Sequence, residues 1–137
     1  MTEAPSSPVV PHLVVKGGKA AISFYEKAFG AQCLFSHPAE DGERLLHASL
    51  SINGGTVMLH DEFPEYGDGG VAAPRTGGTT TVTIHLNVDD ADKWWDRAIK
   101  AGAEVVFPLE DQFWGERYGK LRDPFGHIWS LLHPLTQ

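Results

Sequence analysis

The sequence predicts an α+β fold in which two tandem βαβββ modules form a curved eight-stranded mixed sheet around a cleft. Three observations support this prediction: an internal repeat, a hairpin turn at a similar place in each copy, and a connecting segment rich in glycine, proline and acidic residues. Each module buries one face of its sheet under a helix, so the second copy supplies a partner for the first.

The repeat relates "HLVVKGGKAAISFYEKAFGAQCLF", which begins at His12, to "HLNVDDADKWWDRAIKAGAEVVF", which begins at His85. Each segment reads as a strand, a polar turn, an amphipathic helix, a Gly-Ala stop and a further apolar strand. The spacing of apolar residues predicts helices near Gly18 to Phe29 and Asp90 to Ala101. A glycine follows each helix, where it ends the helix without steric cost.

The second halves of the repeat also correspond, because "SINGGTVMLHDE" from Ser51 aligns with "RDPFGHIWSLLHP" from Arg122. The "NGG" and "DPFG" stretches predict tight hairpin turns, each followed by an apolar strand. We interpret "DPFGH" as architecture, with Asp123 and Pro124 setting the turn. This alignment places Leu59 opposite Ser130 in the repeat.

The repeat also sets the expected boundaries. We expect a disordered lead over residues 1–8 and a single domain over 9–134, made of module one (9–61), a linker (62–79) and module two (80–134).

Composition narrows the class of partner. The formal net charge of −7 argues against nucleic acid or an anionic membrane surface. No continuous apolar run approaches the roughly 20 residues of a membrane span, and the first residues lack the features of a signal peptide. We therefore expect a cytoplasmic protein with a small-molecule ligand. Its one cysteine, Cys33, lies in the apolar run "AQCLF" and is expected to be buried.

"PHLVVKGGKAAISFYEKAFGA" and "FWGERYGKLRDPFGHIWSLLHP" resemble the vicinal oxygen chelate (glyoxalase/bleomycin resistance/dioxygenase) superfamily, and within it the PhnB-like branch. The resemblance covers the chain from Val9 to Pro134. It implies paired βαβββ modules in a homodimer, with a divalent metal in those members that are metalloenzymes. The metal ligands there are two histidines and one or two glutamates, from the first and last strands of each module.

The first-strand histidine positions of that family correspond to Val10 and Thr83 in this sequence. His12 and His85 each lie two residues later. A step of two residues keeps a side chain on the same face of a strand and moves it by about 6.6 Å. We therefore expect His12 and His85 to face the cleft, and they are the two residues that we predict as metal ligands.

The last-strand glutamate positions correspond to Leu59 and Ser130, and neither side chain is a good metal ligand. His60 and His133 lie one and three residues away from them, which predicts that they point to the opposite face. The usual cluster of four ligands is therefore not present, and no cofactor beyond a divalent metal is predicted.

Seven residues are predicted to contact a ligand in the cleft. Alternation in "TTTVTIHLNV" places Thr83 and His85 on the polar face of their strand, while Arg117 and Tyr118 lie on opposite faces of theirs. The full set is His12, Thr83, His85, Trp114, Arg117, Tyr118 and Ser130. Three alternatives stay open. The histidines are hydrogen-bonded residues of a semi-polar interior, or Phe113 and Trp114 cap the hairpin and the module core. The third is that Arg117 or Arg122 pairs with a carboxylate such as Glu116, Asp111 or Asp123.

Two functions fit these patterns. In the first, the protein binds a small molecule between the modules and acts on it with lyase, isomerase or transferase chemistry, in which a metal polarises vicinal oxygens. In the second, the cleft sequesters a drug or metabolite without catalysis, as in bleomycin-resistance proteins. The missing carboxylates favour the second function, or an enzyme without a metal, and the sequence leaves open whether the protein is an enzyme.

Overall fold

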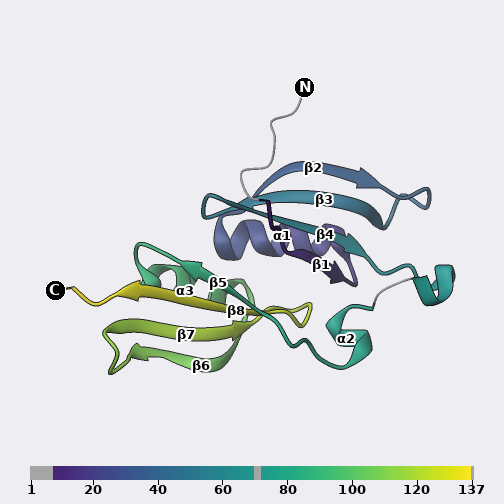
Figure 1. Ribbon diagram of the computed structural model, residues 1–137. Coiled ribbons are helices and arrows are strands. Elements are labelled where there is room, and N and C mark those ends of the chain that lie inside the picture. The colour runs from purple at the N-terminus through teal and green to yellow at the C-terminus, as the bar shows by residue number, and fades with distance from the viewer. Residues whose placement is uncertain (1–7, 70–71, 137) are drawn as a thin grey trace.

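The computed structural model describes residues 8–69 and 72–136, so nearly all of the predicted lead lies outside the described residues. The chain forms two βαβββ modules joined by two short helices (Figure 1). Module one contains β1 (His12–Val15), α1 (Gly18–Phe29), β2 (Gln32–Pro38), β3 (Leu45–Ile52) and β4 (Gly55–Asp61). The connection contains a 3-10 helix, η1 (Pro64–Gly69), and α2 (Pro74–Gly77). Module two contains β5 (Thr83–Asn87), α3 (Ala91–Ala101), β6 (Glu104–Asp111), β7 (Glu116–Arg122) and β8 (Ile128–Pro134).

Each module forms a four-stranded mixed sheet with the same topology. The strand orders are β1-β4-β3-β2 and β5-β8-β7-β6. The β1–β4 and β5–β8 pairs are parallel, and all other neighbouring strands pair in the antiparallel direction. This architecture confirms the predicted fold class. The eight strands form two separately hydrogen-bonded sheets that do not close into a barrel.

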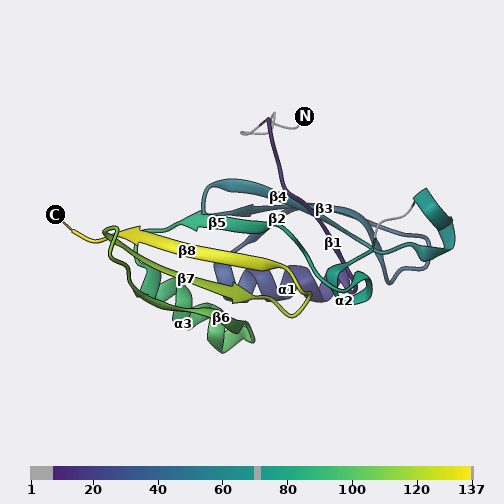
Figure 2. The same ribbon diagram turned by 60° about the horizontal axis from the view of Figure 1, so that its bottom comes forward.

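Both modules share one hydrophobic core, and α1 and α3 lie on the same side of the strands (Figure 2). Trp129 of β8 is fully buried in this core, where its ring lies 4.7 Å from that of Phe29 in α1. The helix bounds follow the prediction closely, and Asp90 caps α3 by accepting a hydrogen bond from the Lys93 N–H. The core uses one side of each sheet, and neither α1 nor α3 covers the other side. We call it the open face. Within the described residues, no helix is long and apolar enough to cross a membrane.

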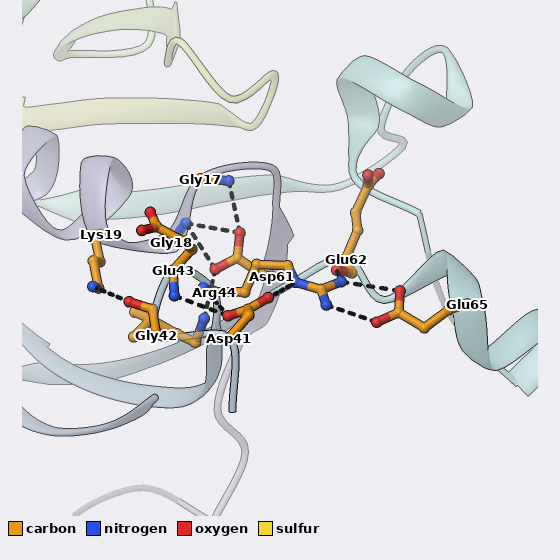
Figure 3. Close-up of polar contacts among 11 residues, drawn as sticks. Gly17, Gly18, Lys19, Asp41, Gly42, Glu43, Arg44, Asp61, Glu62 and Glu65 are labelled. Atoms are coloured by element: carbon orange, nitrogen blue, oxygen red, sulfur yellow. Dashed lines mark hydrogen bonds and ion pairs between the residues drawn. The ribbon is translucent and has the colours of Figure 1, made fainter. Parts of the chain in front are cut away.

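The last strand of each module fixes the start of the module's helix. Asp61 is 2% exposed, and its carboxylate accepts hydrogen bonds from the N–H groups of Gly18 (2.9 Å) and Leu45 (2.8 Å; Figure 3). A Cβ at Gly18 would lie 2.5 Å from this carboxylate, which explains the glycine. In module two, Nδ1 of His133 accepts a hydrogen bond from the Ala91 N–H at 2.8 Å. The His133 side chain therefore lies on the helix side of the sheet, as its spacing predicts.

Arg44 links the connection to module one (Figure 3). Its guanidinium binds Asp41 and Glu65, both at 2.7 Å, and lies 4.4 Å from the ring centre of Phe63. Hydrogen bonds from the backbone N–H and the side chain of Arg44 lower the pKa of Asp41 to about 2. Because these ion pairs are exposed, they set the path of the connection more than they stabilise the fold.

The "DPFGH" turn is architectural, as predicted, and it also joins the modules. The Asp123 carboxylate is 1% exposed and accepts hydrogen bonds from the N–H groups of Phe125 (2.9 Å) and His127 (3.0 Å). It accepts two more, from the Trp129 indole N–H (2.8 Å) and from the Tyr25 hydroxyl (2.5 Å), which belongs to α1. Burial, followed by the charge of Asp123, raises the pKa of Tyr25 well above its ordinary value. Tyr25 therefore stays protonated and donates.

One expectation about the core is wrong. Cys33 is exposed, because β2 is an edge strand whose residues are exposed on both faces. An apolar run at a sheet edge cannot be distinguished from a buried strand by composition.

Candidate functional site

The open face of the second sheet carries four of the predicted ligand contacts. Leu86 of β5 is buried on the helix side, so Thr83 and His85 point to the open face, as the alternation predicts. His85 pairs with Ser130 of β8 in the sheet register, and their side chains share this face. Tyr118 of β7 lies there too, because its ring is stacked on that of His85.

His85 is held by a hydrogen bond at each ring nitrogen. Nε2 lies 2.9 Å from Oδ1 of Asn87, and Nδ1 lies 2.7 Å from Oγ of Ser130. An amide oxygen can only accept, so Nε2 carries the proton and, in a neutral ring, Nδ1 accepts the Ser130 proton. Ser130 is only 2% exposed, whereas His85 and Asn87 are exposed. A ligand oxygen could therefore replace Asn87 as the acceptor, and His85 is oriented to bind or to move a proton.

Tyr118, which adjoins His85, also contacts two further aromatic side chains, and the three form what we call the aromatic row: Phe107, Trp114 and Tyr118. Tyr118 is the centre of this row, with ring centroids 5.9 Å from Phe107, 6.1 Å from Trp114 and 6.3 Å from His85. Trp114 is 49% exposed and Phe107 is 40% exposed. The indole N–H of Trp114 donates to Glu116 at 2.7 Å, which fixes its ring orientation. The row therefore leaves aromatic surface exposed to solvent near the hydrogen-bonding imidazole of His85.

Arg117 lies away from this face. It shares the helix side of β7 with Gly119 and Leu121, and its guanidinium pairs with Asp92 of α3 at 3.0 Å and with Asp111 at 2.8 Å. Hydrogen bonds to these two carboxylates raise its pKa. The structure therefore does not bring Arg117 together with Tyr118. It shows the carboxylate pairing that the sequence offers as the alternative.

The open face of the first sheet carries a histidine cluster that the sequence analysis missed in part. The ring of His12 lies 5.0 Å from that of His60 and 5.5 Å from that of His47, measured between centroids. Burial lowers the pKa of His12, and the neighbouring His60 and His47 lower it further. The alternation of "HASLSI" in β3 indicates the face of His47, because Ala48, Leu50 and Ile52 are buried on the other side of the strand.

The strand register corrects the position of His60. The sequence alignment matched Leu59 with Ser130, but His12 pairs with Met58 just as His85 pairs with Ser130. Leu59 is fully buried on the helix side, and His60 lies on the face of His12 rather than opposite it. The alignment slipped by one residue because the turns before β4 and β8 differ in length.

These residues do not fit the four-ligand metal centre that the family resemblance implies. The side chains that pair with His12 and His85 are the thioether of Met58 and the hydroxyl of Ser130, where a carboxylate would be needed. In the described parts of the chain, no group of three or more His, Cys, Asp or Glu side chains is placed to hold a metal ion. The assignment of His12 and His85 as metal ligands stays a prediction.

The histidine cluster leads to a prediction about titration. We expect His12 to titrate below 6.5, the ordinary pKa of histidine, in an NMR pH titration of the imidazole signals. His60→Gln should raise the pKa of His12 but leave it below 6.5, because burial is the larger cause. His37→Gln is the matched control and should leave it unchanged. A normal pKa for His12, or equal effects of both variants, would contradict this description of the cluster.

Comparisons with known proteins agree with the geometry. The family model described as Glyoxalase/Bleomycin resistance protein/Dioxygenase superfamily matches residues 8–131. Protein Rv0887c of Mycobacterium tuberculosis (strain H37Rv) is 53% identical over 127 residues, which cover 93% of this chain and 74% of that protein. The crystal structure of TioX from Micromonospora sp. ML1 has a TM-score of 0.71 and 31% identity, and the match covers 96% of this chain and 98% of TioX.

A PhnB protein from Bacillus cereus has a TM-score of 0.70 over 93% of this chain and 99% of that chain. Its identity of 17% shows a shared fold. The match of the family model over nearly the whole described chain, together with the TioX likeness, identifies the family. The chain belongs to the glyoxalase/bleomycin resistance protein/dioxygenase superfamily.

Proposed function

We propose that this protein binds a small molecule with a flat aromatic part on the open face of the second sheet. The aromatic row carries this proposal. Phe107 is 40% exposed and Trp114 is 49% exposed, and both contact the half-buried Tyr118. Apolar surface that gathers in one exposed patch marks a site for a ligand or a partner. Tyr118 would provide the stacking surface, with Trp114 and Phe107 on either side.

The neighbouring polar groups support a ligand that also carries a hydrogen-bonding atom. His85 is stacked on Tyr118, and its Nε2–H donates to the exposed Asn87. Lys120 lies two residues after Tyr118 on the same face of β7. A few polar groups beside an apolar wall are typical of small-molecule sites.

The proposed function of this site is to bind a ligand, and catalysis would be an additional property. The family includes resistance proteins as well as enzymes, as its description states. Met58 and Ser130 occupy the positions from which a carboxylate would hold a metal next to His12 and His85. Catalysis by this site would therefore rely on proton transfer at His85, which its two hydrogen bonds orient.

The proposal includes the homodimer that the family resemblance implies. Leu34 and Val105 are exposed on the edge strands β2 and β6, which gives a second copy apolar surface to cover.

Trp114 provides the test of the proposed site. The neutral probe 4-nitrobenzyl alcohol is expected to quench tryptophan fluorescence saturably, because Trp114 is the most exposed of the four tryptophans. Trp114→Phe should keep binding, measured by NMR titration of the probe, and lose most of the quenching. Linear, unsaturable quenching that persists in Trp114→Phe would count against a site at the aromatic row.

A further inference from the structure

The second sheet and the connection between the modules form a cavity, partly open to solvent, at one end of the open face of that sheet. Its volume is about 250 Å³. One wall is formed by α2, which contains Arg75, and by the residues that follow this helix. The other wall is formed by Arg122 and Ile128 of the second sheet. Arg122 and Ile128 are paired in the sheet register, and they close the row of β7 and β8 residues that begins at Tyr118.

The cavity is built by close packing of α2 on the β7–β8 turn. A Cβ at Gly126 would lie 2.8 Å from Cβ of Pro74, so only glycine lets α2 approach this closely. Arg75 is anchored at the same turn, because its Nε–H donates to the carbonyl oxygen of Pro124 at 3.2 Å. One nitrogen of the guanidinium is thereby fixed, and its two Nη nitrogens have no hydrogen-bond partner within residues 8–69 and 72–136.

The positive charges of the Arg75 and Arg122 guanidinium groups are only weakly balanced by neighbouring carboxylates. Arg75 makes no ion pair with any carboxylate of the described residues. Among the carboxylates of residues 8–69 and 72–136, Arg122 pairs only with Glu104, at 3.5 Å, and the Glu104 side chain is 62% exposed. The adjacent Asp123 is turned into the core, where four donors bind it. The chain has a net charge of −7, yet this cavity is lined by two arginines and therefore suits a negatively charged group.

We propose that Arg75 and Arg122 form an oxyanion pocket that holds the carboxylate or phosphate end of the ligand. Guanidinium groups bind such oxygens with paired, charge-assisted hydrogen bonds. A cavity of about 250 Å³ is smaller than the roughly 300–1,000 Å³ of sites that hold a whole drug-sized ligand. Tyr118 lies four residues before Arg122 on the same face, or about 13 Å along the strand. The pocket therefore suits one end of a ligand whose aromatic part lies on Tyr118, and this link rests on the proposed function.

Titration with inorganic phosphate tests the pocket by itself. Amide shifts in ¹H–¹⁵N spectra, at ionic strength held constant with sodium chloride, are expected to saturate and to cluster in residues 75–79 and 122–128. The double variant Arg75→Gln/Arg122→Gln should lower the phosphate affinity at least about tenfold. Lys93→Gln/Lys100→Gln changes the net charge equally on the exposed face of α3 and should leave the affinity unchanged. Shifts that do not saturate, or that survive in the arginine double variant, would overturn the pocket.

6-Phenylhexyl phosphate and acetate separate the phosphate pocket from its link to the aromatic row. The hexyl chain lets the ring of this probe reach Tyr118 while its phosphate lies at Arg122, about 13 Å away along the strand. 6-Phenylhexyl phosphate should bind more tightly than inorganic phosphate, and acetate should shift the same amides if the pocket accepts carboxylates. Tyr118→Ala should weaken the binding of 6-phenylhexyl phosphate and leave that of inorganic phosphate unchanged. If Tyr118→Ala does not weaken the binding of 6-phenylhexyl phosphate, the pocket is not the anionic end of the aromatic site and the link is overturned. If phosphate fails to bind while the aromatic probe still binds, the pocket fails and the proposed function stands.

Discussion

Replacing Asp123 with alanine is expected to lower the free energy of unfolding by about 3 kcal/mol or more. The reason is that its buried carboxylate satisfies four donors at once. Two of them are the backbone N–H groups that shape the turn before β8. The others are the Tyr25 hydroxyl and the Trp129 indole, which lie in the core shared by the modules. A buried donor left without a partner costs about 1–3 kcal/mol.

Urea denaturation of Asp123→Ala and two comparison variants measures this effect. Asp111→Ala is the matched control, because Asp111 is 61% exposed in its pair with Arg117 and should cost less than about 1 kcal/mol. Tyr25→Phe removes one of the four donors and should cost about 1 kcal/mol. If Asp123→Ala is as stable as Asp111→Ala, the carboxylate does not hold the modules together in the way described.

The fold could be predicted from the sequence because its signals are local. Apolar residues at helical spacing, a glycine after each helix and the two turn sequences occur within short windows, and each occurs twice. The observed α1 begins and ends where the spacing indicates, and α3 begins one residue later because Asp90 is its cap. Alternation in β5 also placed Thr83 and His85 correctly, since one face of that strand is covered by the core.

The first-sheet part of the candidate site could not be predicted because it depends on strand register. A slip of one residue in the alignment reversed the faces of Leu59 and His60, and so hid the contact of His60 with His12. The correct pairing of Met58 with His12 is a property of the parallel β1–β4 ladder, which connects residues far apart in the sequence.

Other features depend on tertiary packing alone. Whether Arg117 faces a ligand or a carboxylate depends on which side of β7 α3 covers, and the structure shows Asp92 of α3 beside it. The exposure of Cys33 follows from the place of β2 at the edge of its sheet. The arginine-lined cavity arises because α2 packs on Gly126, a contact across about 50 residues that no local pattern indicates.

The open face at Tyr118 is proposed to bind the aromatic part of a ligand. Removing the Tyr118 ring should therefore lower affinity for 4-nitrobenzyl alcohol about tenfold, since stacking on an aromatic side chain contributes roughly 1 kcal/mol or more. Tyr66→Ala is the matched control, because Tyr66 is 68% exposed on η1 and stacks on Phe63, away from β7. The near-ultraviolet circular dichroism of both variants should show that the core around Trp129 is intact.

The most direct measurement is the dissociation constant of 4-nitrobenzyl alcohol for the wild type, Tyr118→Ala and Tyr66→Ala, obtained by NMR titration under identical conditions. The predicted result is saturable binding to the wild type and Tyr66→Ala with equal affinity, and binding about tenfold weaker for Tyr118→Ala. Equal affinity for all three proteins, or loss in Tyr66→Ala alone, would contradict a ligand site on the open face of the second sheet.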